Sequence, residues 1–160
     1  MAVDMFLKID GIKGESKDHK HKDEIHVESF SWGATNMGTQ GSGGGGGAGK
    51  VNVQDFIVTK LVDASSADLF LSCAGGKHIP KAEFVVRKAG EKPLEYLKIK
   101  MSDILISSIQ QGGNNGGDLV TESLSINYAK IEFEYAPQDS KGAGGAPSKA
   151  GWDVKGNTKV

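Results

Sequence analysis

The sequence predicts a mostly β protein with one short α-helix packed on a sheet. Most segments alternate apolar and polar residues, which is the period of a strand with one buried face. In several of these segments the apolar residues move from odd to even positions partway along. Such a change indicates a bulge, or a strand that leaves one sheet and joins another. The spacing of the segments favours about seven or eight strands in a sandwich or barrel.

The N-terminal third is expected to contain three strands and a loop. Residues 3–9 alternate as a first strand, whereas 13–23 are rich in lysine and histidine and have no apolar period. We therefore expect an exposed loop over 13–23. The segments 25–32 and 51–58 both begin as alternating strands with apolar residues at odd positions and finish with them at even positions. Strand bending thus recurs along the chain.

One segment predicts a helix. Ser65 and Asp68 have the spacing of a capping box, with Ser65 as the N-cap, and Gly75 and Gly76 supply a stop. The apolar residues between these signals follow helical spacing and are expected to pack on the sheet: Leu69, Phe70, Cys73 and Ala74. Cys73 is accordingly expected to be buried filler and not a nucleophile.

The C-terminal half is expected to centre on a long hairpin within 94–135. Both of its arms change the parity of their apolar residues, which predicts a hairpin bent around a barrel corner. A shorter strand over 82–86 should precede it. A flexible Gly/Ala/Pro/Ser linker is expected at 139–150, before a last short strand at 151–154.

Composition excludes several classes of function. The chain has 19 basic and 20 acidic residues, and Arg87 is its single arginine, so a nucleic-acid surface is not expected. A net charge near zero permits self-association. Cys73 has no partner for an internal disulfide, the start does not read as a signal peptide, and no stretch approaches the roughly 20 apolar residues that cross a bilayer. We expect a soluble cytosolic protein forming a single domain over 1–160.

The glycine-rich run contains two motifs of nucleotide-binding proteins, and both fail in context. Residues 44–50 match the P-loop string up to its lysine, but Val51 stands where Ser or Thr should bind magnesium. The residues that follow alternate as a strand, so no helix N-terminus is available for a phosphate. The Gly-x-Gly-x-x-Gly at 41–46 fails for the same reason. A flexible loop that reaches a neighbour is the better interpretation.

No catalytic or metal site is expected. His19, His21 and His26 could suggest metal ligands, but lysines surround the first two and no cysteine or regular histidine spacing completes a site. A solvated loop is the preferred interpretation. No Ser–His–Asp order or carboxylate pair indicates an active site, so we expect neither an enzyme nor a cofactor.

Two polar features leave alternatives open. The uncharged turn at 110–118 is either an ordinary solvent-exposed hairpin or a neutral surface that touches varied cargo. Glu132 and Glu134 lie on one face of a strand, which is either solvated or in contact with another subunit. Composition alone does not choose between these readings.

Taken in order, many short strings resemble Hcp, the haemolysin-coregulated protein family that forms the inner tube of the bacterial type VI secretion system. The resemblance covers nearly the whole chain. It is carried by the residues at 1–6, 13–16, 31–33, 43–55, 76–78, 87–90, 95–97 and 151–152. The loops at 17–24 and 110–120 and the tail at 138–150 depart from the family pattern.

The resemblance implies two packed antiparallel β-sheets forming a β-barrel, with one short α-helix at the side. It also implies homohexameric rings that stack into a tube, spike and sheath components as partners, and small effector proteins carried in the lumen. Family members are expelled when the surrounding sheath contracts. The chain would therefore be cytoplasmic before firing and secreted afterwards, without membrane insertion.

The resemblance also directs two site predictions. A ring-contact loop is expected to comprise Gly43, Gly44, Gly45, Gly46, Gly47, Ala48, Gly49, Lys50, Val51, Asn52, Val53, Gln54 and Asp55. The channel lining is expected to include Gln110, Gln111, Asn114 and Asn115. Two alternatives remain. One is an Hcp fused to an enzyme, disfavoured because only eight residues follow Trp152. The other is a monomeric β-sandwich binding module without a tube role, which would need a large apolar groove.

Overall fold

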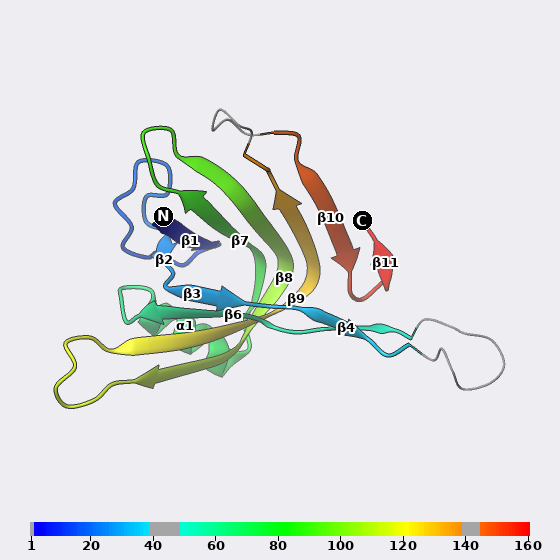
Figure 1. The fold of residues 1–160 in the computed structure, drawn as a ribbon. Coiled ribbons are helices and arrows are strands. Elements are labelled where there is room, and N and C mark those ends of the chain that lie inside the picture. The colour runs from blue at the N-terminus through cyan, green and yellow to red at the C-terminus, as the bar shows by residue number, and fades with distance from the viewer. Residues whose placement is uncertain (1, 39–48, 139–144) are drawn as a thin grey trace.

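The computed structural model describes residues 2–38, 49–138 and 145–160. Within them the fold is mostly β with one short α-helix, which confirms the predicted class (Figure 1). The elements, in chain order, are β1 (Val3–Ile9), β2 (Ile25–His26), β3 (Ser29–Ser31), β4 (Ala34–Asn36), β5 (Val51–Val53), β6 (Phe56–Leu61), α1 (Ser66–Gly75), β7 (His78–Lys88), β8 (Leu94–Gly112), β9 (Thr121–Tyr135), β10 (Ser148–Asp153) and β11 (Thr158–Lys159).

Nine of these strands form one antiparallel sheet. Its main path runs β11-β10-β9-β8-β7-β1-β2, while β6 pairs with the first half of β9 and β3 pairs with β6. Strands β4 and β5 form a separate two-stranded ribbon. In Figure 1 the sheet folds over on itself, so that β3, β6 and the hairpin tip form a lower layer and the other strands an upper one.

The long hairpin bends where the sequence predicted. Met101 pairs with Ile131 and Ile104 pairs with Tyr128, so the parity changes of the two arms lie opposite each other. All four side chains are buried. A register shift between Ile106 and Ser108 adds a bulge to β8. Because both arms turn together, one hairpin contributes to both layers.

The core lies between the layers. Phe84 of the upper layer packs against Phe30 and Phe56 of the lower layer, with ring centroids 4.6 Å and 5.1 Å away. Aromatic pairs at this separation contribute beyond the area they bury. The barrel implied by the resemblance remains open on one side, between β10 and the β4–β5 ribbon, since no strand pairing joins them.

Helix α1 has the predicted position but not the predicted capping box. Ser65 is the N-cap residue, yet its side chain makes no cap bond and its hydroxyl donates instead to Asp63 at 2.5 Å. The C-terminus follows the prediction, because Gly76 adopts a left-handed conformation and its amide bonds the Cys73 carbonyl. Leu69 is buried, whereas Phe70 and Ala74 are exposed, contrary to the expected apolar face.

Some strands are longer than the sequence predicted, because pairing with a neighbouring strand extends them. Strand β7 continues well beyond both ends of the predicted 82–86, because β1 and β8 supply partners along it. Strand β10 starts at Ser148, inside the segment expected to be a linker; residues 139–144 of that segment lie outside the described residues. The short strands β4 and β11 were not predicted, since pairing alone defines them.

Candidate functional site

The loop between β1 and β2 is closely packed, and the prediction that 13–23 is an exposed loop is wrong for its inner residues. Ser16 and His21 are only 1% and 7% exposed. The His21 ring stacks on Phe6 of β1 at 4.3 Å. A Cβ at Gly14 would lie 2.4 Å from the Glu24 carbonyl oxygen, so glycine permits the loop to close on itself.

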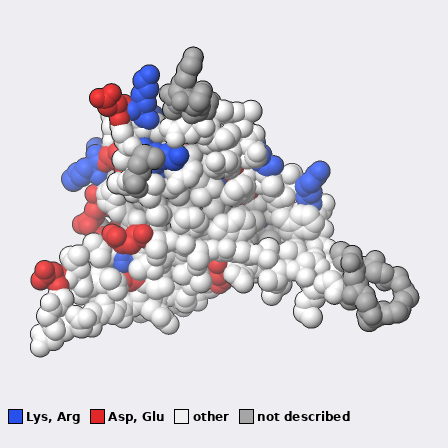
Figure 2. Space-filling view, in the orientation of Figure 1, with Lys and Arg blue, Asp and Glu red and all other residues white. Residues whose placement is uncertain are grey.

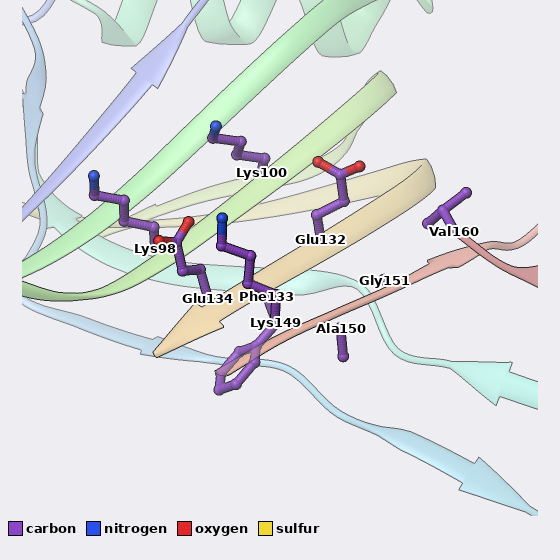
Figure 3. Close-up of a pocket in the computed structure, with 9 residues that line it drawn as sticks. All are labelled: Lys98, Lys100, Glu132, Phe133, Glu134, Lys149, Ala150, Gly151 and Val160. Atoms are coloured by element: carbon purple, nitrogen blue, oxygen red, sulfur yellow. The ribbon is translucent and has the colours of Figure 1, made fainter. Parts of the chain in front are cut away.

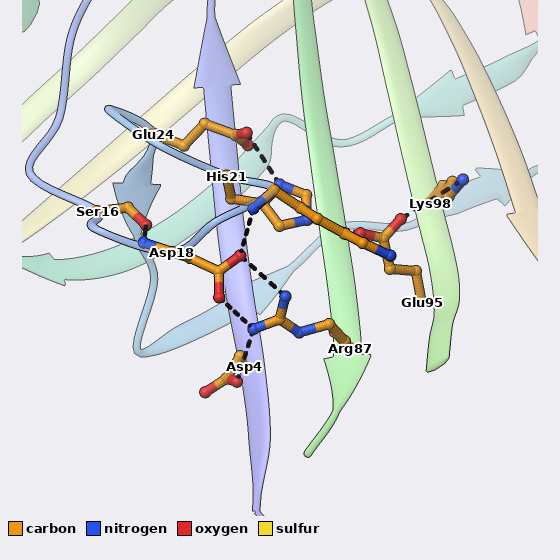
Figure 4. Close-up of polar contacts among 9 residues, drawn as sticks. Asp4, Ser16, Asp18, His21, Glu24, Arg87, Glu95 and Lys98 are labelled. Atoms are coloured by element: carbon orange, nitrogen blue, oxygen red, sulfur yellow. Dashed lines mark hydrogen bonds and ion pairs between the residues drawn. The ribbon is translucent and has the colours of Figure 1, made fainter. Parts of the chain in front are cut away.

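His21 joins the loop to the sheet through two carboxylates (Figure 4). Its Nδ1 lies 2.9 Å from Glu24 Oε2 and its Nε2 lies 2.6 Å from Glu95 Oε1. Both ring nitrogens can donate only when the imidazole is doubly protonated. Burial acts to raise the pKa of Glu95, but the hydrogen bond and charge of His21 bring that pKa below its usual value. His21 therefore links the loop to Glu95 of β8.

A second polar link uses the single arginine. Arg87 donates to both carboxylate oxygens of Asp18, at 3.0 Å and 2.7 Å, and to Asp4 at 3.2 Å. Its guanidinium also lies 5.0 Å from the centre of the Phe6 ring. The hydrogen bond from Arg87 holds the pKa of the Asp18 carboxyl well below its ordinary value. This pair, 69 residues apart in sequence, holds the loop on β1 and β7.

The described ranges contain neither a cluster of metal-binding side chains nor a membrane-spanning helix. No group of three His, Cys, Asp or Glu side chains there is placed to bind a metal ion. No helix in the same ranges is long and apolar enough to cross a bilayer. Val51 begins strand β5 directly after Lys50, so the P-loop string lacks the helix that would receive a phosphate.

The outer face of the upper layer carries alternating charges. Lys8, Glu83, Lys100 and Glu132 follow one another across four paired strands. A shallow pocket of about 280 Å³ lies beside this row (Figure 3), lined by Lys98, Lys100, Glu132, Phe133, Glu134, Lys149, Ala150, Gly151 and Val160. Opposite charges on neighbouring strands stabilise a sheet modestly. The alternation of charges in this row therefore has a structural role within one subunit.

The β4–β5 ribbon contains the described part of the predicted ring-contact loop. Residues 43–48 lie outside the described residues. Gly49 lies just before β5, and its carbonyl accepts the Asn36 side-chain amide at 2.6 Å. A Cβ at Gly49 would lie 2.6 Å from the Met37 carbonyl oxygen, so only glycine fits there. The ribbon projects to the right of the body in Figure 1.

Two residues of that predicted set anchor the ribbon to its own subunit. Gln54 accepts the Tyr128 hydroxyl at its carbonyl oxygen, at 2.7 Å. Asp55 accepts Ser107 at 2.6 Å and Asn127 at 3.0 Å. Burial, and secondly the charge of Asp55, raises the pKa of Tyr128 to about 12. Lys50 and Asn52 are exposed, while Val51 and Val53 are half-buried.

An apolar cleft runs along the open side of the barrel, and we call it the seam. Its volume is about 280 Å³, and it is lined by Trp32, Ala34, Val51, Val53, Ile131, Phe133, Ala150, Gly151 and Trp152. Ile131 belongs to the core, and the Trp32 and Phe133 rings lie 6.4 Å apart. The indole nitrogen of Trp152 is buried without a hydrogen-bond partner in the described structure. The seam thus exposes apolar surface continuous with the core.

The lower layer presents an uncharged outer face rich in hydroxyl groups, which we call the hydroxyl face. Paired residues of an antiparallel sheet share a face. The register therefore places these residues on one side: Ser29, Ser31, Ile57, Thr59, Ser108, Gln110, Thr121, Ser123 and Ser125. The core residues Phe56, Val58, Leu124 and Ile126 occupy the alternate positions. Figure 2 shows this lower part mostly free of charge, while charged side chains gather on the upper left.

The predicted lumen residues divide between two sides of the hairpin. Gln110 lies on the hydroxyl face, opposite Ser123. Gln111 points to the other side, where its amide donates to Glu122 at 2.8 Å, so it does not line the hydroxyl face. Asn114 and Asn115 are exposed at the tip of the hairpin. The alternation of serine with Leu124 and Ile126 was the sequence signal for this face.

A buried ion pair ties α1 to the lower layer. Lys60 and Glu122 are 0% and 1% exposed, and Lys60 Nζ lies 2.5 Å from Glu122 Oε2. Ser66 of α1 donates to the same carboxylate at 2.9 Å, and Asp63 lies 3.0 Å from Lys60. Burial acts to raise the pKa of Glu122, but hydrogen bonds from Gln111, Lys60 and Ser66 bring it below its usual value.

Comparisons with known proteins agree with this arrangement. The family described as "Type VI secretion system effector, Hcp" matches residues 6–135. "Protein hcp1" of Pseudomonas aeruginosa is 48% identical, over the full length of both chains. The crystal structure of Hcp1 from Salmonella typhimurium is 39% identical with a TM-score of 0.84, covering all of both chains. A solved type six secretion system protein is 33% identical with a TM-score of 0.94, covering 99% of this chain and all of that one.

Proposed function

The chain belongs to the Hcp family of type VI secretion proteins, and from this premise we propose that six copies form a ring that stacks into the inner tube. The family is one of structural, secreted tube proteins and not of enzymes. We propose that the chain resides in the cytoplasm before firing and leaves the cell when the sheath around the tube contracts. Spike and sheath components are its proposed partners.

One observation supports the proposal most directly: a chain of this family carries two different surfaces, the seam and the β4–β5 ribbon, that its own fold leaves uncovered. A closed ring joins each subunit to the next through two different, complementary patches. The seam leaves apolar core residues uncovered, and the ribbon projects from the body beside it. Both features are expected of a subunit that is completed by its neighbours.

The ring itself is tested on the purified full chain. Analytical ultracentrifugation should find a species several times heavier than the 16.9 kDa monomer, and negative-stain electron microscopy should show annular particles. A lone monomer at high concentration, with no annular particles, would overturn the proposal. It would favour the binding-module alternative instead, for which the seam is the required apolar groove.

We further propose that the glycine-rich loop and the exposed residues of its flank contact a neighbouring subunit. Lys50 and Asn52 are the exposed members of that flank, whereas Gln54 and Asp55 act as its anchors. Deleting 43–49 should abolish stacked tubes, because glycine permits a close approach of chains that other residues block. Electron microscopy at matched protein concentration measures tube length. Tubes and hexamers indistinguishable from those of the wild type would contradict this role.

The hydroxyl face is the proposed channel wall, together with the hairpin tip. A neutral surface rich in hydroxyl groups can hydrogen-bond varied cargo without strong charge selection. Replacing Ser123 or Asn115 with tryptophan should lower the amount of a co-expressed small effector that co-purifies with the rings by about tenfold, as the loss of roughly 1.4 kcal/mol of contact gives. Lys81→Trp, on the charged face, serves as the control. If all three variants retain equal amounts of effector, the hydroxyl face and the hairpin tip do not line the channel.

A further inference from the structure

Helix α1 exposes a second apolar side. Its buried side is formed by Leu69, Ser66 and Ser72. Ala67, Phe70, Leu71 and Ala74 are all exposed and follow the spacing i, i+3, i+4 and i+7, so they form one stripe, which we call the outer stripe. Phe70 and Leu71 are 58% and 65% exposed.

The composition of α1 shows that this stripe is not an ordinary solvated side. A surface helix normally opposes its apolar side with charged residues, whereas a helix that is apolar all round is covered all round. The only charged residue of α1 is Asp68, and its last turn has no basic residue. The sheet covers one side of α1 and leaves the outer stripe uncovered among the described residues, so this stripe is a candidate contact surface.

The same chain carries an unfilled surface suited to this stripe. The seam is concave and apolar, and two tryptophans and a phenylalanine line it. Aromatic residues are enriched at the centres of protein interfaces, where an anchor side chain fills a pocket. In Figure 1, α1 lies behind the lower layer on the left, whereas the ribbon that borders the seam projects to the right. A subunit therefore cannot use its own stripe to fill its own seam.

The charges around the two surfaces are complementary. One exposed lysine borders the seam, because Lys159 pairs with Trp152 and paired residues share a face of the sheet. Asp153, which follows Trp152, already accepts the Gly156 amide at 3.1 Å. The outer stripe is flanked by the exposed carboxylate of Asp68.

We infer that the outer stripe of α1 docks into the seam of a second copy of this chain, with Phe70 and Leu71 as anchors. The contact is heterologous, since two different surfaces meet, and it can repeat from subunit to subunit until a ring closes. This inference rests on the proposed ring and names the surfaces that hold neighbouring subunits together within it.

Two charge substitutions at exposed positions test the contact without disturbing the core. Leu71→Asp places a charge in the stripe, and Ala34→Asp places one in the seam. Each variant alone should sediment as a 16.9 kDa monomer with the circular dichroism of the wild type. Leu119→Asp is the matched control, because Leu119 is 63% exposed on the hairpin turn and belongs to neither surface; this variant should form rings.

Mixing the two monomeric variants gives the sharper result. The intact stripe of Ala34→Asp fits the intact seam of Leu71→Asp, and the remaining surfaces are both blocked. The mixture should therefore form a one-to-one dimer that grows no further. Rings formed by Leu71→Asp alone, or a mixture that stays monomeric, would overturn the inference while leaving the ring intact as a proposal. A wild-type protein that is itself monomeric would overturn the proposed function and this inference together.

Discussion

Replacing Lys60 with methionine is expected to lower the free energy of unfolding by about 3–5 kcal/mol, because it leaves the Glu122 carboxylate buried without its partner. Lys60 is fully buried and Glu122 nearly so, so water cannot replace the lost cation. Hydrogen bonds from Ser66 and Gln111 to Glu122 remain, but they do not neutralise its charge. Urea denaturation followed by circular dichroism measures the change.

The double variant Lys60→Met/Glu122→Met distinguishes the cost of leaving one charge unpaired from the net contribution of the ion pair. Replacing both members of a buried pair with apolar residues is often neutral or stabilising, since neither charge then needs to be desolvated. We expect the double variant to recover most of the stability that Lys60→Met loses. A double variant less stable than the single one would show instead that Lys60 and Glu122 act through shape and hydrogen bonding to Ser66.

Replacing Asp18 with asparagine is expected to destabilise the protein at neutral pH by about 1.5–3 kcal/mol, the usual contribution of hydrogen bonds to a charged group. Arg87 lowers the pKa of Asp18 in the folded state, so the folded chain binds this proton less readily than the unfolded chain. The stabilisation is therefore complete above the unfolded pKa of about 4 and is lost as the pH falls through the lower folded value.

The difference between wild type and Asp18→Asn should accordingly shrink on acidification below about pH 4. Thermal unfolding at several pH values measures it. Asp23→Asn is the matched control, because Asp23 lies in the same loop, is exposed, and has a positive φ that asparagine tolerates. A difference that does not change with pH would show that Asp18 acts through packing and not through its charge.

The sequence predicted the elements whose pattern is local. The bend of the long hairpin was visible because the parity of apolar residues changes in both arms, and the structure places those changes at Met101–Ile131 and Ile104–Tyr128. The end of α1 was visible in Gly75 and Gly76. The predicted apolar side of α1 was partly wrong, because spacing identifies apolar residues but not which of two apolar sides meets the sheet.

The polar links were not predictable in the same way. Arg87 and Asp18 are 69 residues apart, His21 and Glu95 are 74 apart, and Lys60 and Glu122 are 62 apart. Each of these residues resembles a solvated charge in its own segment. The two members of each pair come into contact only after β1, β7, β8 and β9 have paired. No short-range sequence pattern therefore predicts these contacts.

By itself, the sequence determined a mostly β chain with bent strands, one short helix and the family to which it belongs. The tertiary structure alone decided that the sheet stays open at the seam, that Gln110 and Gln111 face opposite sides, and that the loop residue His21 is buried. The physical reason is the range of the interactions. Periodicity along a strand reports that one face is buried, whereas the partner that buries it is chosen by strand pairing between distant segments.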